Sequence, residues 1–233
     1  MIYEVCCGSL AAVAEAYCKG AQRVEFCSAL DVDGLMPDMD DVAAARRSMP
    51  GLRMHVLIRP RPGNFCYTPA EVDLMCDYVE TALDEGADGV VTGCLTPEGD
   101  VDIPAMEKLM DTVRCWKLAQ VLRGDMCHAS NDAHFFEGRL LRHTEPSVTF
   151  HRAFDVCRRP MQALEDIIGL GCDRILTSGQ AVSAQEGIPL LRKLVKKAGD
   201  RIIIMPGGGI TVENRDAIAS ATGAVELHGT RIV

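Results

Sequence analysis

Basic residues are scarce relative to acidic ones in this sequence of 233 residues. It contains 24 Lys and Arg against 33 Asp and Glu, which gives a net charge of -9 and an isoelectric point near 5.1. A nucleic-acid-binding surface is strongly basic, and an anionic membrane also attracts positive charge, so we expect neither as a partner. The composition is that of an ordinary acidic, soluble protein.

Long apolar runs are also missing. No uninterrupted run approaches the roughly 18 residues that a membrane-spanning helix needs. The first five residues carry no basic side chain, and Glu4 interrupts their apolar character. We therefore expect no secretory signal and a cytoplasmic location.

No two cysteines are spaced as CxxC, which argues against a zinc ribbon or a thioredoxin-type motif. The 11 cysteines are an odd number in a chain without a recognisable signal. Reduced thiols are therefore expected rather than a disulfide framework. Most of them should be small buried hydrophobic side chains.

Short apolar runs with strand character alternate with helical segments along the whole chain. The expected strands are residues 2–7, 22–27, 53–59, 89–94, 147–151, 173–177, 201–205 and 224–228. The expected helices are residues 10–19, 40–48, 68–85, a segment from 104, 160–170, 184–198 and 212–221. This alternation predicts an α/β protein, a (β/α)8 TIM barrel that forms one domain over residues 1–233. An open doubly wound sheet is the alternative, which the even spacing disfavours.

Two segments depart from the regular pattern. Residues 114–145 are too long for one connection and are expected to be an insertion before the fifth strand, built of a helical extension and a loop. Its Cys127, His128, His134 and His143 match no tight metal motif, so we expect structural or exposed side chains. The chain stops at Val233, so an incomplete eighth helix is expected.

Three expected strands end in the same pattern, a glutamate followed two residues later by a soft metal ligand. The pairs are Glu4 with Cys6, Glu25 with Cys27, and Glu226 with His228. Residues two apart share a face, and the first, second and eighth strands of a closed barrel are neighbours. Thiolates and imidazole suit Cu(I) or Zn(II), so these side chains are a candidate metal site. Cysteines that merely fill the core are the alternative.

The opposite side of the barrel mouth is expected to be basic. Arg59 and Arg61 follow the third strand, and Arg152 follows His151 at the end of the fifth. These arginines could clamp a carboxylate or phosphate, or they could neutralise the glutamates. Ser178 and Gly208 lie in loops that offer backbone amides to a substrate, as such loops do in many barrels.

Several segments together resemble the CutC copper homeostasis family. They are Glu4-Val5-Cys6, Arg23-Val24-Glu25-Phe26-Cys27-Ser28, Ile58-Arg59-Pro60-Arg61, Val148-Thr149-Phe150-His151-Arg152-Ala153-Phe154-Asp155, Leu176-Thr177-Ser178-Gly179 and Met205-Pro206-Gly207-Gly208-Gly209-Ile210. The resemblance implies a cytosolic TIM barrel, usually a homo-oligomer such as a dimer or tetramer, linked to copper handling. It also implies Cu(I) binding by two cysteines that match Cys6 and Cys27.

The chain departs from that family's pattern at three places. The loop after the third strand reads Arg59-Pro60-Arg61-Pro62-Gly63-Asn64-Phe65, where the family has Arg-Pro-Arg-Gly-Gly-Asp-Phe, so it is expected to bend differently. The second departure is the insertion at 114–145, and the third is the short segment after the eighth strand.

Two functions follow. The first is a copper homeostasis protein that binds Cu(I) through Cys6 and Cys27, with His228 or Met205 as a possible third ligand. The second is an enzyme acting on a small anionic metabolite. The general acid or base would then be His151, Glu4, Glu25 or Glu226. The sequence leaves open whether the protein is an enzyme.

Overall fold

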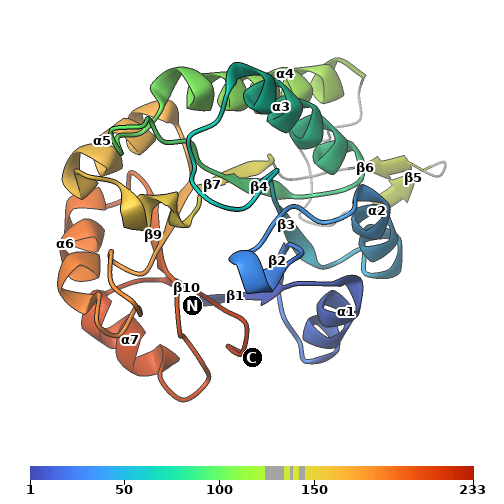
Figure 1. Cartoon of the computed structure of the whole chain (residues 1–233). Helices are drawn as coiled ribbons and strands as arrows, with labels where there is room; N and C mark the ends of the chain where they lie inside the picture. Colours follow the sequence, from blue (N-terminus) through green and yellow to red (C-terminus); the bar gives the residue numbers. More distant parts are fainter. Residues whose placement is uncertain (124–133, 137–138, 142–144) are drawn as a thin grey trace.

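An eight-stranded parallel sheet curls into a barrel, and helices surround it as an outer ring (Figure 1). The computed structural model describes residues 1–123, 134–136, 139–141 and 145–233, with the backbone alone for 134–136 and 139–141. The barrel strands are β1 (Ile2–Cys7), β2 (Arg23–Phe26), β3 (Arg53–Leu57), β4 (Gly89–Thr92), β7 (Ser147–Phe150), β8 (Arg174–Thr177), β9 (Ile203–Pro206) and β10 (Glu226–Gly229). The predicted TIM barrel is confirmed.

The first and last strands of the barrel are hydrogen-bonded neighbours. β1 pairs in parallel with β10, with Ile2 opposite Glu226 and Glu4 opposite His228, and it pairs on its other edge with β2. β9 lies beside β10, but no ladder joins these two strands in the described part of the chain. The barrel is therefore nearly closed, with a seam between β9 and β10.

The helices are α1 (Leu10–Cys18), α2 (Met39–Ser48), α3 (Pro69–Asp84), α4 (Ile103–Arg123), α5 (Pro160–Leu170), α6 (Ile188–Ala198) and α7 (Arg215–Thr222), with 3-10 turns η1 (Leu30–Val32) and η2 (Arg152–Val156). Local sequence explains several starts. Ser9 caps α1 by accepting a bond from the Ala12 N–H. Thr68 and Glu71 form a reciprocal capping box at α3, whose first residue is a proline.

Two helices begin later than the sequence predicted, because tertiary bonds hold their expected first turns. Val212 N–H donates to the Arg231 carbonyl, so α7 begins at Arg215, and Thr211 is not its cap. Ala184 N–H donates to the Gly208 carbonyl, and α6 begins at Ile188. The turn η2 was not predicted.

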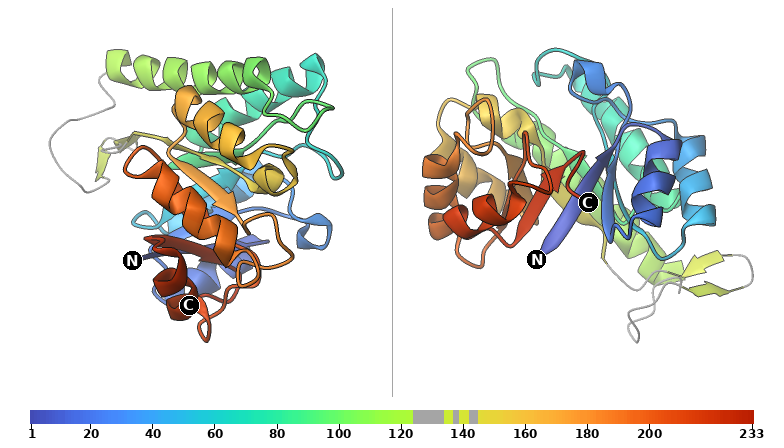
Figure 2. Two further views of the ribbon diagram at one scale, coloured as in Figure 1. Left: turned by 90° about the vertical axis from the view of Figure 1, so that its left-hand side faces the viewer. Right: turned by 90° about the horizontal axis from the view of Figure 1, so that it is seen from below.

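The insertion begins as a continuation of a barrel helix. α4 has 21 residues and reaches Arg123, as the predicted helical extension requires. The short antiparallel strands β5 (His134–Phe136) and β6 (Arg139–Leu141) were not predicted, and they stand away from the barrel (Figure 2). The side chains of Cys127, His128, His134 and His143 lie outside the described residues.

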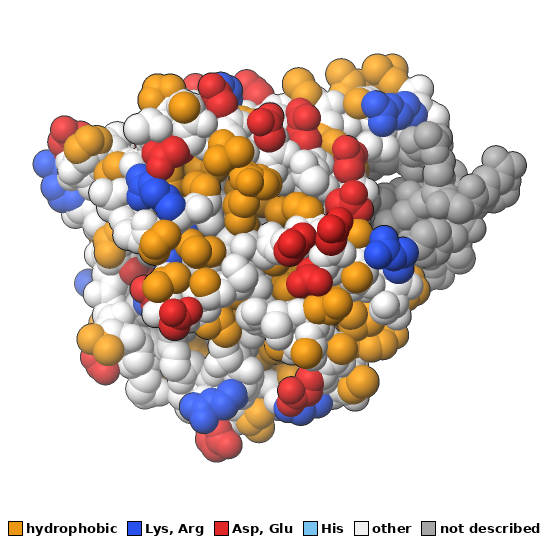
Figure 3. Space-filling view, turned by 45° about the vertical axis from the view of Figure 1, so that its right-hand side comes forward, with side chains coloured by type: hydrophobic (Ala, Val, Ile, Leu, Met, Phe, Trp, Pro, Cys, Tyr) orange, Lys and Arg blue, Asp and Glu red, His pale blue; other side chains and the backbone are white. Residues whose placement is uncertain are grey.

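No helix follows β10 in the described residues 230–233, and the helix ring is interrupted between α7 and α1 (Figure 1). The strand side chains that face outward form the main core with the helices; Val24, Phe26, Val90 and Phe150 are all at most 1% exposed. None of the described helices is long and apolar enough to cross a membrane. On the face shown in Figure 3, acidic side chains gather in a band, whereas Lys and Arg side chains form small separate groups.

Candidate functional site

The interior of the barrel is crossed by ion pairs that reach from strand to strand. Arg23 on β2 donates through Nε to Glu4 Oε2 at 2.7 Å and through Nη2 to Glu226 Oε2. Glu226 also accepts from Arg174 Nε at 2.7 Å. The four side chains are all largely buried. Burial alone would raise the pKa of Glu226, but the two arginines hold it below its usual value.

The ion pairs continue into a closed ring. Arg174 Nη1 donates to Ser147 Oγ at 3.1 Å, Ser147 Oγ lies 3.1 Å from His55 Nε2, and His55 Nδ1 lies 3.0 Å from Glu4 Oε2. Burial would raise the pKa of Glu4, but hydrogen bonds from His228 and His55 and the charge of Arg23 hold it well below its usual range. We call these six residues, Glu4, Arg23, Glu226, Arg174, Ser147 and His55, the interior ring.

The interior ring corrects one interpretation of the sequence. Arg59, Arg61 and Arg152 do not neutralise Glu4 and Glu226; Arg23 and Arg174 do. Glu25 forms no ion pair with an arginine among the described residues. Glu4 and Glu226 are fully engaged in the ring and do not line the cavity at the mouth. A molecule in that cavity therefore does not contact Glu4 or Glu226, which excludes them as its general acid or base.

His228 stands above the ring. Its Nδ1 lies 2.9 Å from Glu4 Oε1, and one nitrogen or oxygen from each of Glu4, Glu25 and His228 lies within 4.8 Å of the other two. Burial opposes protonation of His228, but the charge of Glu25 and hydrogen bonds to Cys6 and Glu4 outweigh it, so its pKa is well above the usual value. His228 is opposite Glu4 in the ladder, one step below Cys6.

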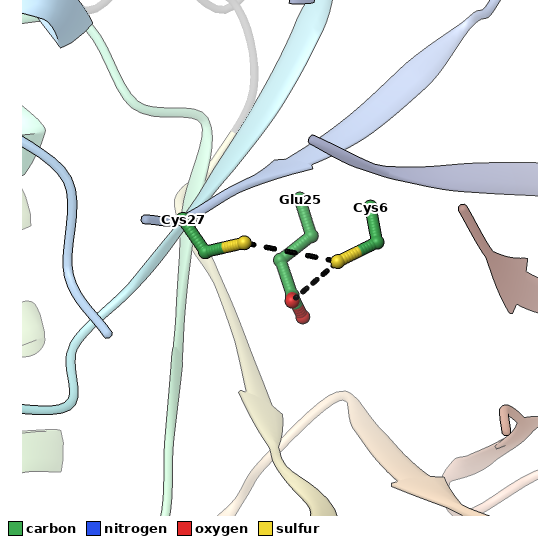
Figure 4. A group of neighbouring side chains, drawn as sticks. All are labelled: Cys6, Glu25 and Cys27. Carbon is green, nitrogen blue, oxygen red and sulfur yellow. Dashed lines mark hydrogen bonds between the residues drawn. The ribbon is translucent and has the colours of Figure 1, made fainter. Parts of the chain in front are cut away.

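The two cysteines approach each other across neighbouring strands (Figure 4). Cys6 Sγ lies 3.7 Å from Cys27 Sγ and 3.7 Å from Glu25 Oε1. Cys6 stands opposite Glu25 in the ladder, so Cys27 is one inward position higher, and the sulfurs meet diagonally. Glu25, not His228, completes this group within 4.8 Å. Cys7 faces the helices instead and donates to the carbonyls of Val5 and Ala12.

Glu25 is a buried carboxylate with an unused oxygen. Glu25 is 5% exposed, and its Oε2 has no hydrogen-bond partner among the described residues. Burial raises the pKa of Glu25, and the charge of Glu4 adds to this effect. The pKa of the Cys6 thiol is also well above its usual value, because of its contact with Cys27, burial and the charge of Glu25.

A cavity of about 410 Å³ opens above these residues at the carboxyl ends of the strands. Of the residues expected from the sequence, it is lined by Cys6, Glu25, Arg59, His151, Arg152, Gly208 and His228. Arg61, Cys27, Ser178 and Met205 are absent from its lining. Met205 Sδ instead accepts from Arg23 Nη2 at 3.3 Å, which occupies it below the mouth.

His151 is held as a neutral imidazole with one free nitrogen. Burial and the charge of Arg59 lower its pKa to about 3. Nδ1 accepts from the Ala153 N–H at 3.3 Å, so the proton of the neutral ring is on Nε2. Nε2 is buried and has no partner within the described chain. The Phe65 ring packs on the imidazole at 4.8 Å, and Gly93 leaves room for it.

Arg59 is a buried loop anchor. Its Nη1 donates to the carbonyls of Val32 and Gly34, and its Nη2 donates to that of Gly63. The guanidinium lies 5.0 Å from the centre of the Phe65 ring. Only Nε is left without a partner in the described structure. Most of the donors by which Arg59 was expected to bind an anion therefore donate to backbone carbonyls instead.

Arg61 points away from the cavity. It pairs with Glu71 at the start of α3 and donates to the carbonyls of Asn64 and Cys66. This is a correction to the sequence interpretation, which placed Arg61 beside Arg59 as a substrate clamp. The cause is the capping box, which positions Glu71 for the pair.

Arg152 lines the cavity and is positioned by Asp155. Its Nε donates to Asp155 Oδ2 at 2.8 Å, and its Nη2 reaches Ser178 Oγ at 3.4 Å. Asp155 also accepts from the Thr177 hydroxyl and the backbone N–H groups of Ser178 and Gln180. Asp155 therefore orders the loop after β8, and Ser178 acts in that loop rather than as a lining residue.

Sequence reasoning missed several of the residues that build the site. Arg23, Arg174 and His55 face inward but were not assigned a role. Arg231 and Thr230 line the cavity beyond β10, and no motif or periodic spacing in the sequence marked them as site residues. The period-two alternation of the strands could have identified the first three.

The fold and the site define a TIM-barrel protein with a thiol- and carboxylate-bearing cavity at the carboxyl ends of its strands. The model of the CutC family matches residues 1–137 and 128–233, and the chain belongs to that family.

Named relatives agree with this assignment. A CutC family protein of Bacteroides thetaiotaomicron is 43% identical over 226 residues, covering 97% of this chain and 79% of its own. One from Chromobacterium violaceum is 41% identical over 229 residues, covering 98% and 80%. A solved structure from Streptococcus agalactiae, described as a candidate copper homeostasis protein CutC, has 29% identity and a TM-score of 0.82, with both chains fully covered. A structure described as the aldolase QR15, at 13% identity and a TM-score of 0.61 over 99% of this chain and 89% of its own, shares the fold alone.

Proposed function

We propose that the protein binds Cu(I) between Cys6 and Cys27 and serves copper homeostasis. The observation that carries this proposal is the 3.7 Å separation of the two sulfurs. Two sulfurs bonded to one ion at about 2.3 Å lie roughly 3.8 Å apart at the tetrahedral angle and about 4.6 Å apart when linear. The thiols are therefore spaced for a bent site that takes a further ligand.

The neighbouring donors suit that third position. Glu25 lies beside both sulfurs with one oxygen unused, and His228 is one ladder step below Cys6. Sulfur and imidazole are the ligands that Cu(I) prefers, whereas a carboxylate suits harder ions. We propose His228 as the third ligand, reached by a side-chain rotation that releases its contact with Glu4. Met205 is held by Arg23 and is not proposed.

A competitive Cu(I) titration tests the proposal. The wild type should hold one Cu(I) per chain against a chelator, and Cys6→Ser and Cys27→Ser should each weaken it by at least about tenfold, the factor that 1.4 kcal/mol represents. Cys7→Ser is the matched control, because its sulfur is turned toward the helices. Equal affinity in all four proteins would remove copper binding at this site.

A location in the cytosol and assembly as a homo-oligomer, a dimer or tetramer, belong to the same proposal. They are supported by the family and by the many reduced cysteines. Size-exclusion chromatography with light scattering tests the assembly, and a mass of one chain would contradict it.

A chemical reaction in the same cavity is the second candidate function. It is favoured by two buried atoms of cavity-lining residues, Glu25 Oε2 and His151 Nε2, which have no hydrogen-bond partner among the described residues. No lysine lines the cavity in the part of the chain that the structure describes, so a lysine Schiff base is not available there. Proton transfer to or from a bound oxygen is the chemistry these groups support.

Untargeted mass spectrometry of a small-molecule extract tests the reaction. The wild type should deplete one anionic compound, and Glu25→Gln and His151→Gln should not. Arg47→Gln, on the exposed face of α2, is the control. Depletion by all variants alike, or by none, would argue against an enzyme.

A further inference from the structure

Two residues that line the cavity carry buried hydrogen-bond donors that lack acceptors in the described chain. His151 and Arg59 are each 4% exposed and line the cavity, and His151 Nε2 and Arg59 Nε have no partner in the described chain. A buried donor without an acceptor is costly, at about 1–3 kcal/mol, so such groups are normally satisfied by something. Both atoms are donors, which calls for an acceptor-rich molecule.

More donors line the cavity where β9 and β10 end. The amide N–H groups of Gly208, Gly209 and Ile210 donate to no protein acceptor in the described structure. Gly208 and Gly209 have φ of +101° and +72°, a conformation that favours glycine, and successive amides in such turns form concavities for anions. A side chain at Gly208 would lie 3.8 Å from the Arg152 guanidinium, so the bare glycine keeps the space beside it open.

Two cations complete this side of the cavity. Arg152 uses Nε and Nη2 on Asp155 and Ser178, while its Nη1 makes no bond to the described residues. Arg231, exposed beyond β10, lines the cavity and forms no ion pair there or elsewhere in the described chain. The loops that follow the seventh and eighth strands are where many TIM barrels hold a phosphate group.

The carboxylates in the lining do not oppose an anion at this position. Asp155 is neutralised by Arg152 and further donors. Glu25 and Asp33 line the cavity from β2 and the turn after it, across the barrel from β9 and η2. The charge of Arg231 also acts on Glu213, which lies outside the lining, so the attraction for an anion comes from Arg231 together with the unbonded Arg152 Nη1 and the amides of Gly208–Ile210.

We propose that Gly208–Ile210, Arg152 and Arg231 bind the phosphate group of a small phosphate monoester. His151 Nε2 and Arg59 Nε donate to a second oxygen of the same molecule. The cavity of about 410 Å³ falls within the range of roughly 300–1,000 Å³ that small-molecule sites occupy. This inference goes beyond copper binding. If the second candidate function holds, it names phosphate monoesters as the substrate class, and its catalytic meaning rests on that function.

Calorimetry with inorganic phosphate and with glycerol 3-phosphate tests the phosphate site, using metal-free full-length protein. Both should bind saturably to the wild type. Arg231→Gln should weaken both by about tenfold or more, since one charge-assisted bond is lost. Arg47→Gln removes an exposed arginine outside the cavity and should leave both unchanged. Absence of saturable binding, or equal affinity in Arg231→Gln and the wild type, would overturn the proposal.

Two further measurements locate the ligand without relying on a variant's stability. In the wild type, phosphate should shift the amide NMR signals of Gly208, Gly209 and Ile210, and unshifted signals would overturn the proposed position. His151→Gln should weaken glycerol 3-phosphate more than inorganic phosphate, and an equal effect on both would overturn the second contact. Binding is scored without turnover and without metal, so failure of either candidate function leaves these results unaffected.

Discussion

Arg23 on β2 reaches past β1 to bind Glu226 on β10, so one side chain ties together three strands from both ends of the chain. The same guanidinium holds Glu4 on β1. The ion pairs lie inside the barrel, where neither partner can be solvated. The closure of the barrel thus depends on charge as well as on the backbone ladder.

Replacing Arg23 by Met should therefore lower the free energy of unfolding by about 3–5 kcal/mol, because two buried carboxylates each lose one of their charged partners. Urea denaturation measures the change. Arg201→Met is the control, since its ion pair with Glu165 is half exposed and should cost less than about 1 kcal/mol. A loss as small as that in Arg23→Met would show that the interior ring contributes little to stability.

The buried neutral His151 should make stability depend on pH. Its pKa is about 3 in the folded protein and about 6.5 when unfolded, so between these values the unfolded chain binds the extra proton. The stability contribution is complete above about pH 6.5 and falls by roughly 1.4 kcal/mol per unit as the pH drops toward 3. Comparing the wild type with His151→Gln isolates this slope from that of the carboxylates. Identical slopes in the two proteins would contradict a buried neutral imidazole.

The space beside His151 should be sensitive to one methyl group. A Cβ at Gly93 would lie 2.6 Å from His151 Nδ1 and 2.8 Å from Cε1. Gly93→Ala should therefore displace the ring and destabilise the fold by about 1–3 kcal/mol. Gly169→Ala in α5 meets nothing within 4 Å and should instead stabilise by about 0.5–1 kcal/mol. Thermal melting of the pair, with the histidine NMR signals, checks both signs; an unmoved His151 signal in Gly93→Ala would count against the contact.

Copper binding should be coupled to proton release. The raised pKa of the Cys6 thiol means that it carries a proton at neutral pH, and the metal needs the thiolate. At pH values below the thiol pKa, the Cu(I) affinity should therefore rise by at least about tenfold for each unit by which the pH is raised. Titrations at two pH values on either side of neutrality measure this slope. Cys6→Ser should lose part of it, whereas a wild-type affinity independent of pH would exclude Cys6 as a ligand.

Sequence periodicity was sufficient for the barrel and for the meeting of its first, second and eighth strands. Two residues per repeat place Glu4 and Cys6 on the same face, and parallel closure brings Cys27 close. The partners of the glutamates could not be foreseen, because they depend on the stagger between strands. That stagger sets Arg23 opposite Glu4 and lifts Cys27 one position above Cys6. It also leaves His228 a step lower than expected.

Loop conformation accounts for the remaining differences. Arg59 and Arg61 are two residues apart in the sequence, yet one anchors three loop carbonyls at the cavity and the other pairs with Glu71 outside it. No periodic pattern describes such a turn. Arg231 follows the last strand, where neither helix nor strand spacing applies.

The pairing of β1 with β10 has a consequence for the order of events in the cell. Glu4 and His228 touch although 224 positions separate them. Cys6 and Cys27 leave the ribosome well before His228 and Arg231. A nascent chain thus carries its thiols long before the strand that encloses them has been made. The proposed ligands come together only once β10 has paired with β1, so loading of the proposed site would report that this pairing has formed.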